Sequence, residues 1–186
     1  MTTVAASTAV RLRPWRADDI DRLARAAADI SPDALALRFG RPGTTIPDWY
    51  ADRIADAWAR GTWNAAVAER GGRIVGWAEY GLDDDPRHAD IAALVCDRYR
   101  GNGLGTRLVR EVASAAGAAA VRVLHAQIRV GNQAARKALY AALPDLRYLG
   151  PQDGEWHYVV CLPETSNRTT PGLPHRGGEI ADARNG

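Results

Sequence analysis

The sequence predicts a mixed α/β fold, an α+β arrangement in which helices flank one central, mostly antiparallel sheet. Two observations support this prediction. Residues 63–96 contain three β-compatible runs, and Arg70-Gly71-Gly72 joins the first two, which indicates a hairpin because glycine accepts positive φ at low cost. After residue 100, helical and strand patterns alternate as far as residue 162.

Apolar periodicity and capping signals locate the individual elements. Ser31 and Pro32 form a good helix start, and Gly61 is placed to end a later helix. Trp49 and Trp58 lie at apolar positions of that later helix, so we expect both to pack in the core. In chain order, the expected elements are a strand at 10–14, helices at 16–30, 34–39 and 47–61, strands at 63–69, 73–80 and 89–96, a helix at 104–118, a strand at 121–128, a helix at 132–143 and a strand at 156–162.

The length and composition predict one domain followed by a tail. A chain of 186 residues with 46% apolar and 25% charged residues can bury a real hydrophobic core. We expect this domain to span residues 1–162. Residues 163–186 shift to Pro, Gly, Thr, Asn and Arg without apolar periodicity, so we expect a flexible C-terminal tail there.

Charge and residue usage exclude several function classes. A formal net charge of +2 gives no reason to expect a nucleic-acid or membrane partner, and no run of residues is long and apolar enough to span a bilayer. Cys96 and Cys161 lie in apolar runs, as buried thiols do in a reducing compartment, so we expect a cytoplasmic protein. The histidines show no i, i+4 pairing and the cysteines lie far apart, so no metal is expected.

A glycine-rich turn between a predicted strand and a predicted helix is the strongest functional signal. Unpaired backbone N–H groups and the helix dipole both favour an anion at such a place, and glycine lets a phosphate approach the backbone closely. Arg100 could add a charge-assisted contact. The residues expected to form this phosphate site are Arg100, Gly101, Asn102, Gly103, Leu104, Gly105 and Thr106.

Two other phosphate sites can be tested against the same residues. A P-loop needs a Lys followed by Ser or Thr after its last glycine, but Gly105 is followed by Thr106 and Arg107. A dinucleotide fingerprint needs a glycine at position 106 and an opening strand–helix–strand unit, and the chain has neither. Both alternatives fail, which leaves the turn itself to be explained.

The run from Arg100 to Gly105 resembles the Q/R-x-x-G-x-G/A acetyl-CoA signature of GNAT acetyltransferases, with the family's apolar strand before it and its amphipathic helix after it. This resemblance covers about residues 10–162. It implies the GNAT acyl-CoA N-acyltransferase fold, in which a parallel pair of strands, here 92–95 and 121–128, splays apart to hold the pantetheine arm of acetyl-CoA. It also implies cofactor contacts from the backbone of Leu94 and Val95 and from Asn132, which could equally be a helix cap.

The same resemblance implies two proton-transfer residues. Asp90 stands where many GNAT enzymes have a catalytic glutamate, and because Asp is one methylene shorter we expect it to act through a bridging water. Glu79, on the preceding strand, is the alternative base. Tyr140 resembles the family tyrosine that protonates the departing CoA thiolate, although it lies one residue farther from Asn132 than in the usual pattern.

These observations predict an acetyl-CoA-dependent N-acetyltransferase that acts on a primary amine by direct transfer in a ternary complex. Residues 31–39 are similar to a segment of bacterial Pat-type protein-lysine acetyltransferases, so the acceptor could be a small molecule or a protein lysine. The acidic residues 83–85 would favour a cationic acceptor if they face the cleft. The alternatives are a CoA-binding sensor with little transferase activity and a transferase for a larger acyl group. The sequence allows a monomer or a homodimer.

Overall fold

The computed structural model describes residues 9–164, in which one seven-stranded sheet is flanked by five α-helices. The elements in chain order are β1 (Arg11–Pro14), α1 (Asp19–Ala26), the 3-10 helix η1 (Ala27–Asp29), α2 (Pro32–Phe39), α3 (Asp48–Ala59), β2 (Trp63–Arg70), β3 (Arg73–Leu82), β4 (His88–Val95), the 3-10 helix η2 (Asp97–Tyr99), α4 (Leu104–Ala118), β5 (Val123–Arg129), α5 (Gln133–Ala142), β6 (Arg147–Gln152) and β7 (Glu155–Cys161). Of the predicted tail at 163–186, residues 165–186 lie outside the described residues.

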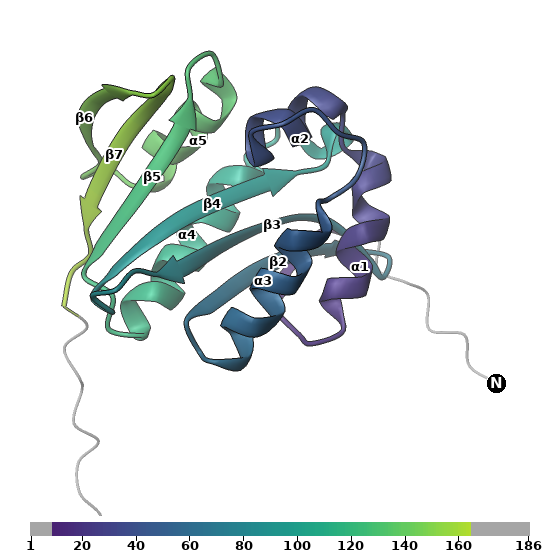
Figure 1. Ribbon diagram of the computed structural model, residues 1–186, viewed down its shortest axis with the longest axis horizontal. Coiled ribbons are helices and arrows are strands. Elements are labelled where there is room, and N and C mark those ends of the chain that lie inside the picture. The colour runs from purple at the N-terminus through teal and green to yellow at the C-terminus, as the bar shows by residue number, and fades with distance from the viewer. Residues whose placement is uncertain (1–8, 165–186) are drawn as a thin grey trace, which may run out of the picture.

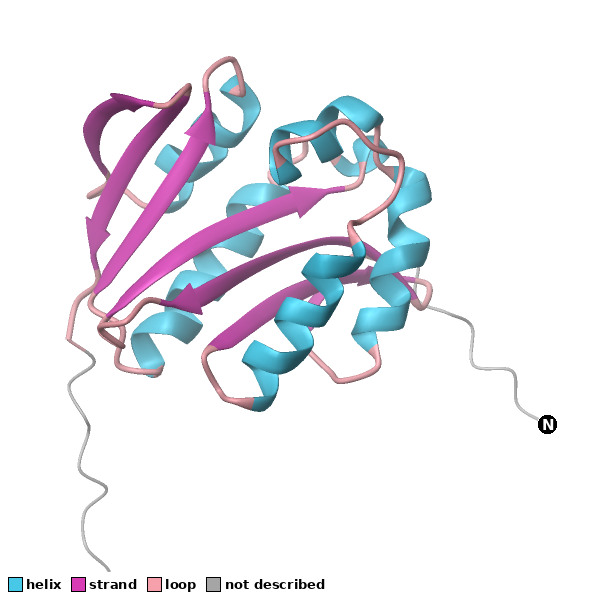
Figure 2. Cartoon of the chain, viewed as in Figure 1, coloured by secondary structure: helices cyan, strands magenta, loops and turns pink. Residues whose placement is uncertain are grey.

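The sheet has the strand order β1-β2-β3-β4-β5-β7-β6, and every neighbouring pair is antiparallel except β4 and β5. This confirms the mixed α/β fold with one parallel strand pair. Helices α1, α2 and α3 cover one face of the sheet, and α4 and α5 cover the other (Figures 1 and 2). Two separate apolar clusters fill the two layers between the helices and the sheet.

The predicted hairpin and meander form as expected. Gly71 and Gly72 both have positive φ, at +55° and +76°, which is the geometry of a tight two-residue hairpin turn. The β2–β3 ladder closes on Arg70 and Arg73, and β4 then pairs with β3 over seven residues. The expected helix at 104–118 coincides with α4.

One strand was missed in the sequence. β6 contains Gly150 and Pro151 and leaves most of its residues exposed, so it shows none of the alternation that identifies a half-buried strand. Asp153 and Gly154 join β6 to β7 with φ values of +52° and +80°. This Asp-Gly pair is the hairpin signal that could have located β6.

The prediction for the tryptophans of α3 was wrong. The exposed fractions of Trp49 and Trp58 are 45% and 38%, whereas Tyr50 and Ile54 on the same helix are almost completely buried. These two buried residues lie four apart and so share one helix face, and that face is the one that packs on the sheet. Trp49 is therefore a surface residue on the α1–α3 side of the molecule.

No helix within residues 9–164 is long and apolar enough to cross a membrane.

Candidate active site

The parallel strands β4 and β5 pair only where they begin. The register pairs are His88 with Val123, Ala89 with Leu124, and Asp90 with His125. Beyond Asp90, β4 remains paired with β3, and beyond His125, β5 remains paired with β7, so the two strands separate (Figure 1). This confirms the predicted splayed pair. A sheet that divides in this way leaves two strand edges that can bind an extended ligand.

The β3–β4 ladder decides which peptide groups face this split. Cys96 donates its N–H to Val75 O (3.0 Å), so these two residues form a hydrogen-bonded pair. The next pair, Gly76 and Val95, is then a non-hydrogen-bonded pair, and the N–H and C=O of Val95 point away from β3. The same alternation directs the peptide groups of Ala93 toward the split and those of Leu94 toward β3. The backbone groups presented to a ligand are therefore those of Ala93 and Val95 rather than those of Leu94.

The glycine turn follows directly at the end of β4. Gly101 and Gly103 have φ values of +78° and +73°, and no heavy atom lies within 4 Å of the position that a Cβ would occupy on either residue. The first N–H bonded within α4 is that of Arg107, to Gly103 O (3.1 Å). The N–H groups of residues 104–106 therefore lack intrahelical partners and lie at the positive end of a 15-residue helix.

Side chains around the turn hold it against its neighbours. Arg100 donates from Nε to Val95 O (3.0 Å) and forms an ion pair with Asp97 (2.8 Å), which places its guanidinium at the open end of the split. A Cβ on Gly105 would lie 3.7 Å from Ala138 Cβ, an ordinary van der Waals distance. An alanine at this position would therefore fit without a clash.

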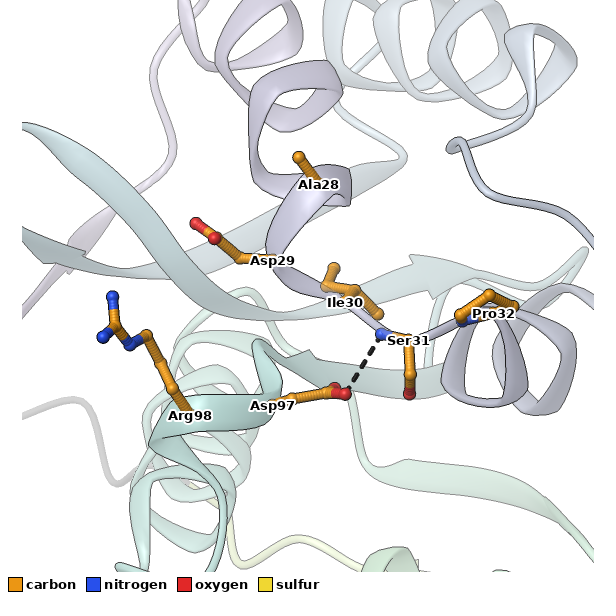
Figure 3. A pocket seen from close by; sticks show the side chains of 7 residues that line it. All are labelled: Ala28, Asp29, Ile30, Ser31, Pro32, Asp97 and Arg98. Carbon is orange, nitrogen blue, oxygen red and sulfur yellow. Dashed lines mark hydrogen bonds between the residues drawn. The ribbon is translucent and has the colours of Figure 1, made fainter.

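A hollow of about 460 Å³ lies next to η2 (Figure 3). It is formed between the segment from Ala28 to Pro32 and the η2 residues Asp97 and Arg98. Asp97 points toward Ser31 and accepts its N–H at 3.2 Å. None of the candidate catalytic residues lines this hollow, so we distinguish it from the split.

Asp90 lies at the closed end of the split, on the sheet face that α1, α2 and α3 cover. Partial burial raises the pKa of its carboxyl group above the ordinary value, the nearby charge of Asp83 raises it further, and His125 and Arg53 oppose the shift. Enough of the residue's surface remains exposed for a substrate or water to reach the carboxyl group. Asp90 therefore combines access with a raised pKa, which suits a general base.

Glu79 lies on the same sheet face but is only 4% exposed. It forms an ion pair with Arg38 (2.5 Å) and accepts hydrogen bonds from Tyr50 and Trp77. Burial and the nearby Glu79 carboxylate raise the pKa of the Tyr50 hydroxyl. Burial lowers the pKa of the Arg38 guanidinium, but the negative charge and hydrogen bond of Glu79, together with Tyr50, outweigh this effect, so the pKa of Arg38 is raised. Glu79 therefore links α2 and α3 to β3 through these contacts.

The structure also brings together two histidines that are 37 residues apart in the chain. His88 Nδ1 lies 3.1 Å from His125 Nε2, and the rings stack with centroids 5.4 Å apart. The spacing of the histidines in the sequence bore only on the prediction that no metal is bound. No local signal could have joined these two, because the parallel register of β4 and β5 places them side by side.

Tyr140 and Asn132 lie at different ends of α5. Asn132 is the N-cap and accepts the N–H of Ala135 at 3.1 Å, so the helix-cap interpretation holds for its side-chain oxygen. Tyr140 is 40% exposed, and its ring packs edge-on against Tyr158. Ala138, which contacts α4, is two residues from Tyr140, or about 200° around the helix. Tyr140 therefore points away from α4.

Among residues 9–164, no three His, Cys, Asp or Glu side chains converge in a way that could hold a metal ion.

Comparison with known proteins decides the family. The profile of the Acetyltransferase (GNAT) family matches residues 31–143, which include both strands of the split, the glycine turn and α5. The chain belongs to the GNAT acetyltransferase family. No curated protein matches this GNAT chain. The family match accounts for the splayed strands and the phosphate-type turn together.

Solved structures share the GNAT fold at low sequence identity. The GNAT domain of S. lividans PAT superposes with a TM-score of 0.73 at 21% identity, over 82% of this chain and 90% of that chain. yncA, a putative acetyltransferase from Salmonella typhimurium with its cofactor acetyl-CoA, gives 0.66 at 17% identity over 84% and 96%. A phosphinothricin acetyltransferase from Sinorhizobium meliloti in complex with acetyl-CoA gives 0.66 at 18% identity over 88% and 95%.

Proposed function

We propose that this GNAT protein transfers an acetyl group from acetyl-CoA to a primary amine by direct attack in a ternary complex. The observation that supports this most strongly is the open split between β4 and β5, which ends beside the free N–H groups of the glycine turn. One end fits an extended arm with amide groups, and the other fits a diphosphate. Two of the structures that share the fold contain acetyl-CoA.

In this proposal the cofactor lies along the split. The turn holds the pyrophosphate through the N–H groups of residues 101–106, and Arg100 adds a positive charge. The peptide groups of Ala93 and the N–H of Val95 pair with the pantetheine amides, because Val95 O already accepts from Arg100, and the amide nitrogen of Asn132 is available at the start of α5. Most of the rate acceleration then comes from positioning the thioester and from backbone N–H groups that polarise its carbonyl.

Asp90 removes the proton from the acceptor ammonium through a bridging water, and Tyr140 protonates the leaving thiolate. Asp90 is preferred to Glu79 because Glu79 is buried and paired with Arg38, whereas Asp90 is exposed. A lysine-like ammonium has a pKa of about 10.4, so a nearby base is needed for attack at neutral pH. We place the reaction in the cytoplasm. Neither cysteine forms a disulfide, although only Cys96 is buried and Cys161 is exposed, unlike the expectation from the sequence.

The acceptor is a primary amine on a small molecule or a protein lysine. Asp83 and Asp90 bring negative charge to the acceptor side, which favours a cationic amine. The test is calorimetric titration with acetyl-CoA, followed by an assay of CoA release with polyamines, amino acids, lysine peptides and larger acyl-CoA donors. Release with at least one amine supports the proposal. Binding without release for every amine and donor favours the CoA-binding sensor.

We expect the Asp90→Asn variant to turn over about 100-fold more slowly at neutral pH while binding acetyl-CoA as tightly as the wild type, because it loses a proton acceptor and no cofactor contact. Since burial raises the pKa of Asp90, the acid limb of the wild-type kcat profile should lie above the ordinary carboxyl range. Asp84→Asn, in the exposed loop before β4, is the matched control and should keep wild-type turnover. Unchanged turnover in Asp90→Asn would exclude Asp90 as the base.

A further inference from the structure

Four titratable residues lie between the closed end of the split and the surface loop before β4, and strand register, one side-chain hydrogen bond and one backbone hydrogen bond connect them in sequence. Asp90 and His125 are opposite each other in the last register pair before the strands separate. His125 is hydrogen-bonded to His88 at 3.1 Å. At the outer end, hydrogen bonds from Arg87, together with the charge of His88, lower the pKa of Asp85 to about 2.

The hydrogen bond between the two imidazoles limits the charge that they can carry. In such a bond one ring nitrogen donates and the other accepts, so the pair holds at most one added proton while the bond persists. Histidine is also the side chain that ordinarily gains and loses a proton between about pH 5 and 8. The pair is therefore suited to take up one proton and pass it on.

We propose that the His125–His88 pair receives the proton that Asp90 removes from the acceptor ammonium and delivers it to solvent. This inference rests on the proposed function. An N–H bond of the ammonium breaks, Asp90 is protonated through water and returns to its carboxylate, and an N–H bond forms on the imidazole pair. The pair then loses this proton to water at the exposed loop 83–87. His125 and His88 act through Asp90, so they are positioning residues of the reaction.

The groups around the pair are consistent with this direction of transfer. Asp83 and Arg53 act on Asp90 with opposite signs, one from the loop and the other from α3. Close to His88 in the chain, Arg87 and Asp85 form an ion pair with each other, with an N–O distance of 2.9 Å. From β7, the residue opposite His125 is the uncharged Val159. Because Arg87 offsets the charge of Asp85, the outer end carries little net charge to hold the proton, which can pass to water.

The kinetic test uses His125→Gln and His88→Gln, with His157→Gln as the control. His157 lies on β7 opposite Gln127, on the same sheet face but outside this series of four residues. We expect each variant of the pair to lose about tenfold in kcat at pH 7, less than for Asp90→Asn, with unchanged KM for the acceptor and unchanged Kd for acetyl-CoA. Added imidazole should restore kcat in both variants and leave His157→Gln and the wild type unaffected.

Two kinetic outcomes would overturn the inference. One is wild-type kcat in both variants at every pH. The other is a loss of kcat that neither imidazole nor higher pH restores, as expected if the pair only held the strands together.

A measurement that does not depend on acetyltransferase activity separates this inference from the proposed function. NMR titration of the imidazole C2–H signals should show His88 and His125 taking up one proton between them, with a titration that shifts in Asp90→Asn. Two independent titrations that ignore Asp90 would overturn the relay even if the enzyme is active. A wild type that acetylates no amine would contradict the proposed function itself, while the titration would still decide the coupling.

Discussion

Replacing Gly103 with valine is expected to weaken acetyl-CoA binding by about 100-fold or more. Gly103 has φ of +73° at the N-cap of α4, and the space where its side chain would be is open. A β-branched residue cannot hold this conformation easily, and its methyl groups would occupy the space proposed for the diphosphate. Losing two charge-assisted hydrogen bonds of about 1.5–3 kcal/mol each corresponds to at least this loss, which calorimetric titration would measure.

Gly61→Val is the matched control for backbone strain. Gly61 has φ of +70°, also faces open space, and follows the end of α3, away from the glycine turn. Both variants should lose a similar amount of stability, about 1–2 kcal/mol, because both force a branched residue into a left-handed conformation. Only Gly103→Val should lose acetyl-CoA affinity. Equal affinity in the two variants would show that the turn does not hold the cofactor.

Replacing Glu79 with alanine is expected to lower the free energy of unfolding by about 3–5 kcal/mol. The carboxylate is nearly inaccessible, and removing it leaves the Arg38 guanidinium largely buried without its counter-charge. Tyr50 and Trp77 lose a hydrogen-bond acceptor at the same time. Urea denaturation monitored by tryptophan fluorescence measures the loss directly.

The double variant Arg38→Met with Glu79→Leu tests the physical reason. It removes both charges, replaces them with apolar groups of similar size, and leaves Trp77 Nε1 bonded to Tyr50 OH at 3.1 Å. We expect it to recover most of the lost stability, because a buried ion pair contributes little net stability compared with apolar packing. A Glu79→Ala variant as stable as the wild type would mean that Arg38 reaches solvent when its partner is removed.

Local chemistry made most of the elements readable from the sequence. The Gly71-Gly72 hairpin and helix α4 formed where backbone propensity and apolar periodicity placed them, because these signals act over a few residues. β6 escaped because an exposed edge strand with glycine and proline has no buried face to impose a pattern. Trp49 was misplaced because helical spacing predicts which residues share a face but not which face meets the sheet.

The candidate site divides in the same way. The sequence alone determined the glycine turn and the family resemblance, and it predicted a diphosphate site there, since these depend on consecutive residues whose backbone freedom is local. Only the tertiary structure decided that the peptide groups of Val95 face the split while those of Leu94 face β3. It alone also placed Glu79 in a buried ion pair with Arg38, and His125 in a hydrogen bond with His88. The reason is that strand register and helix packing bring together residues far apart in the chain, and no run of neighbouring residues encodes either one.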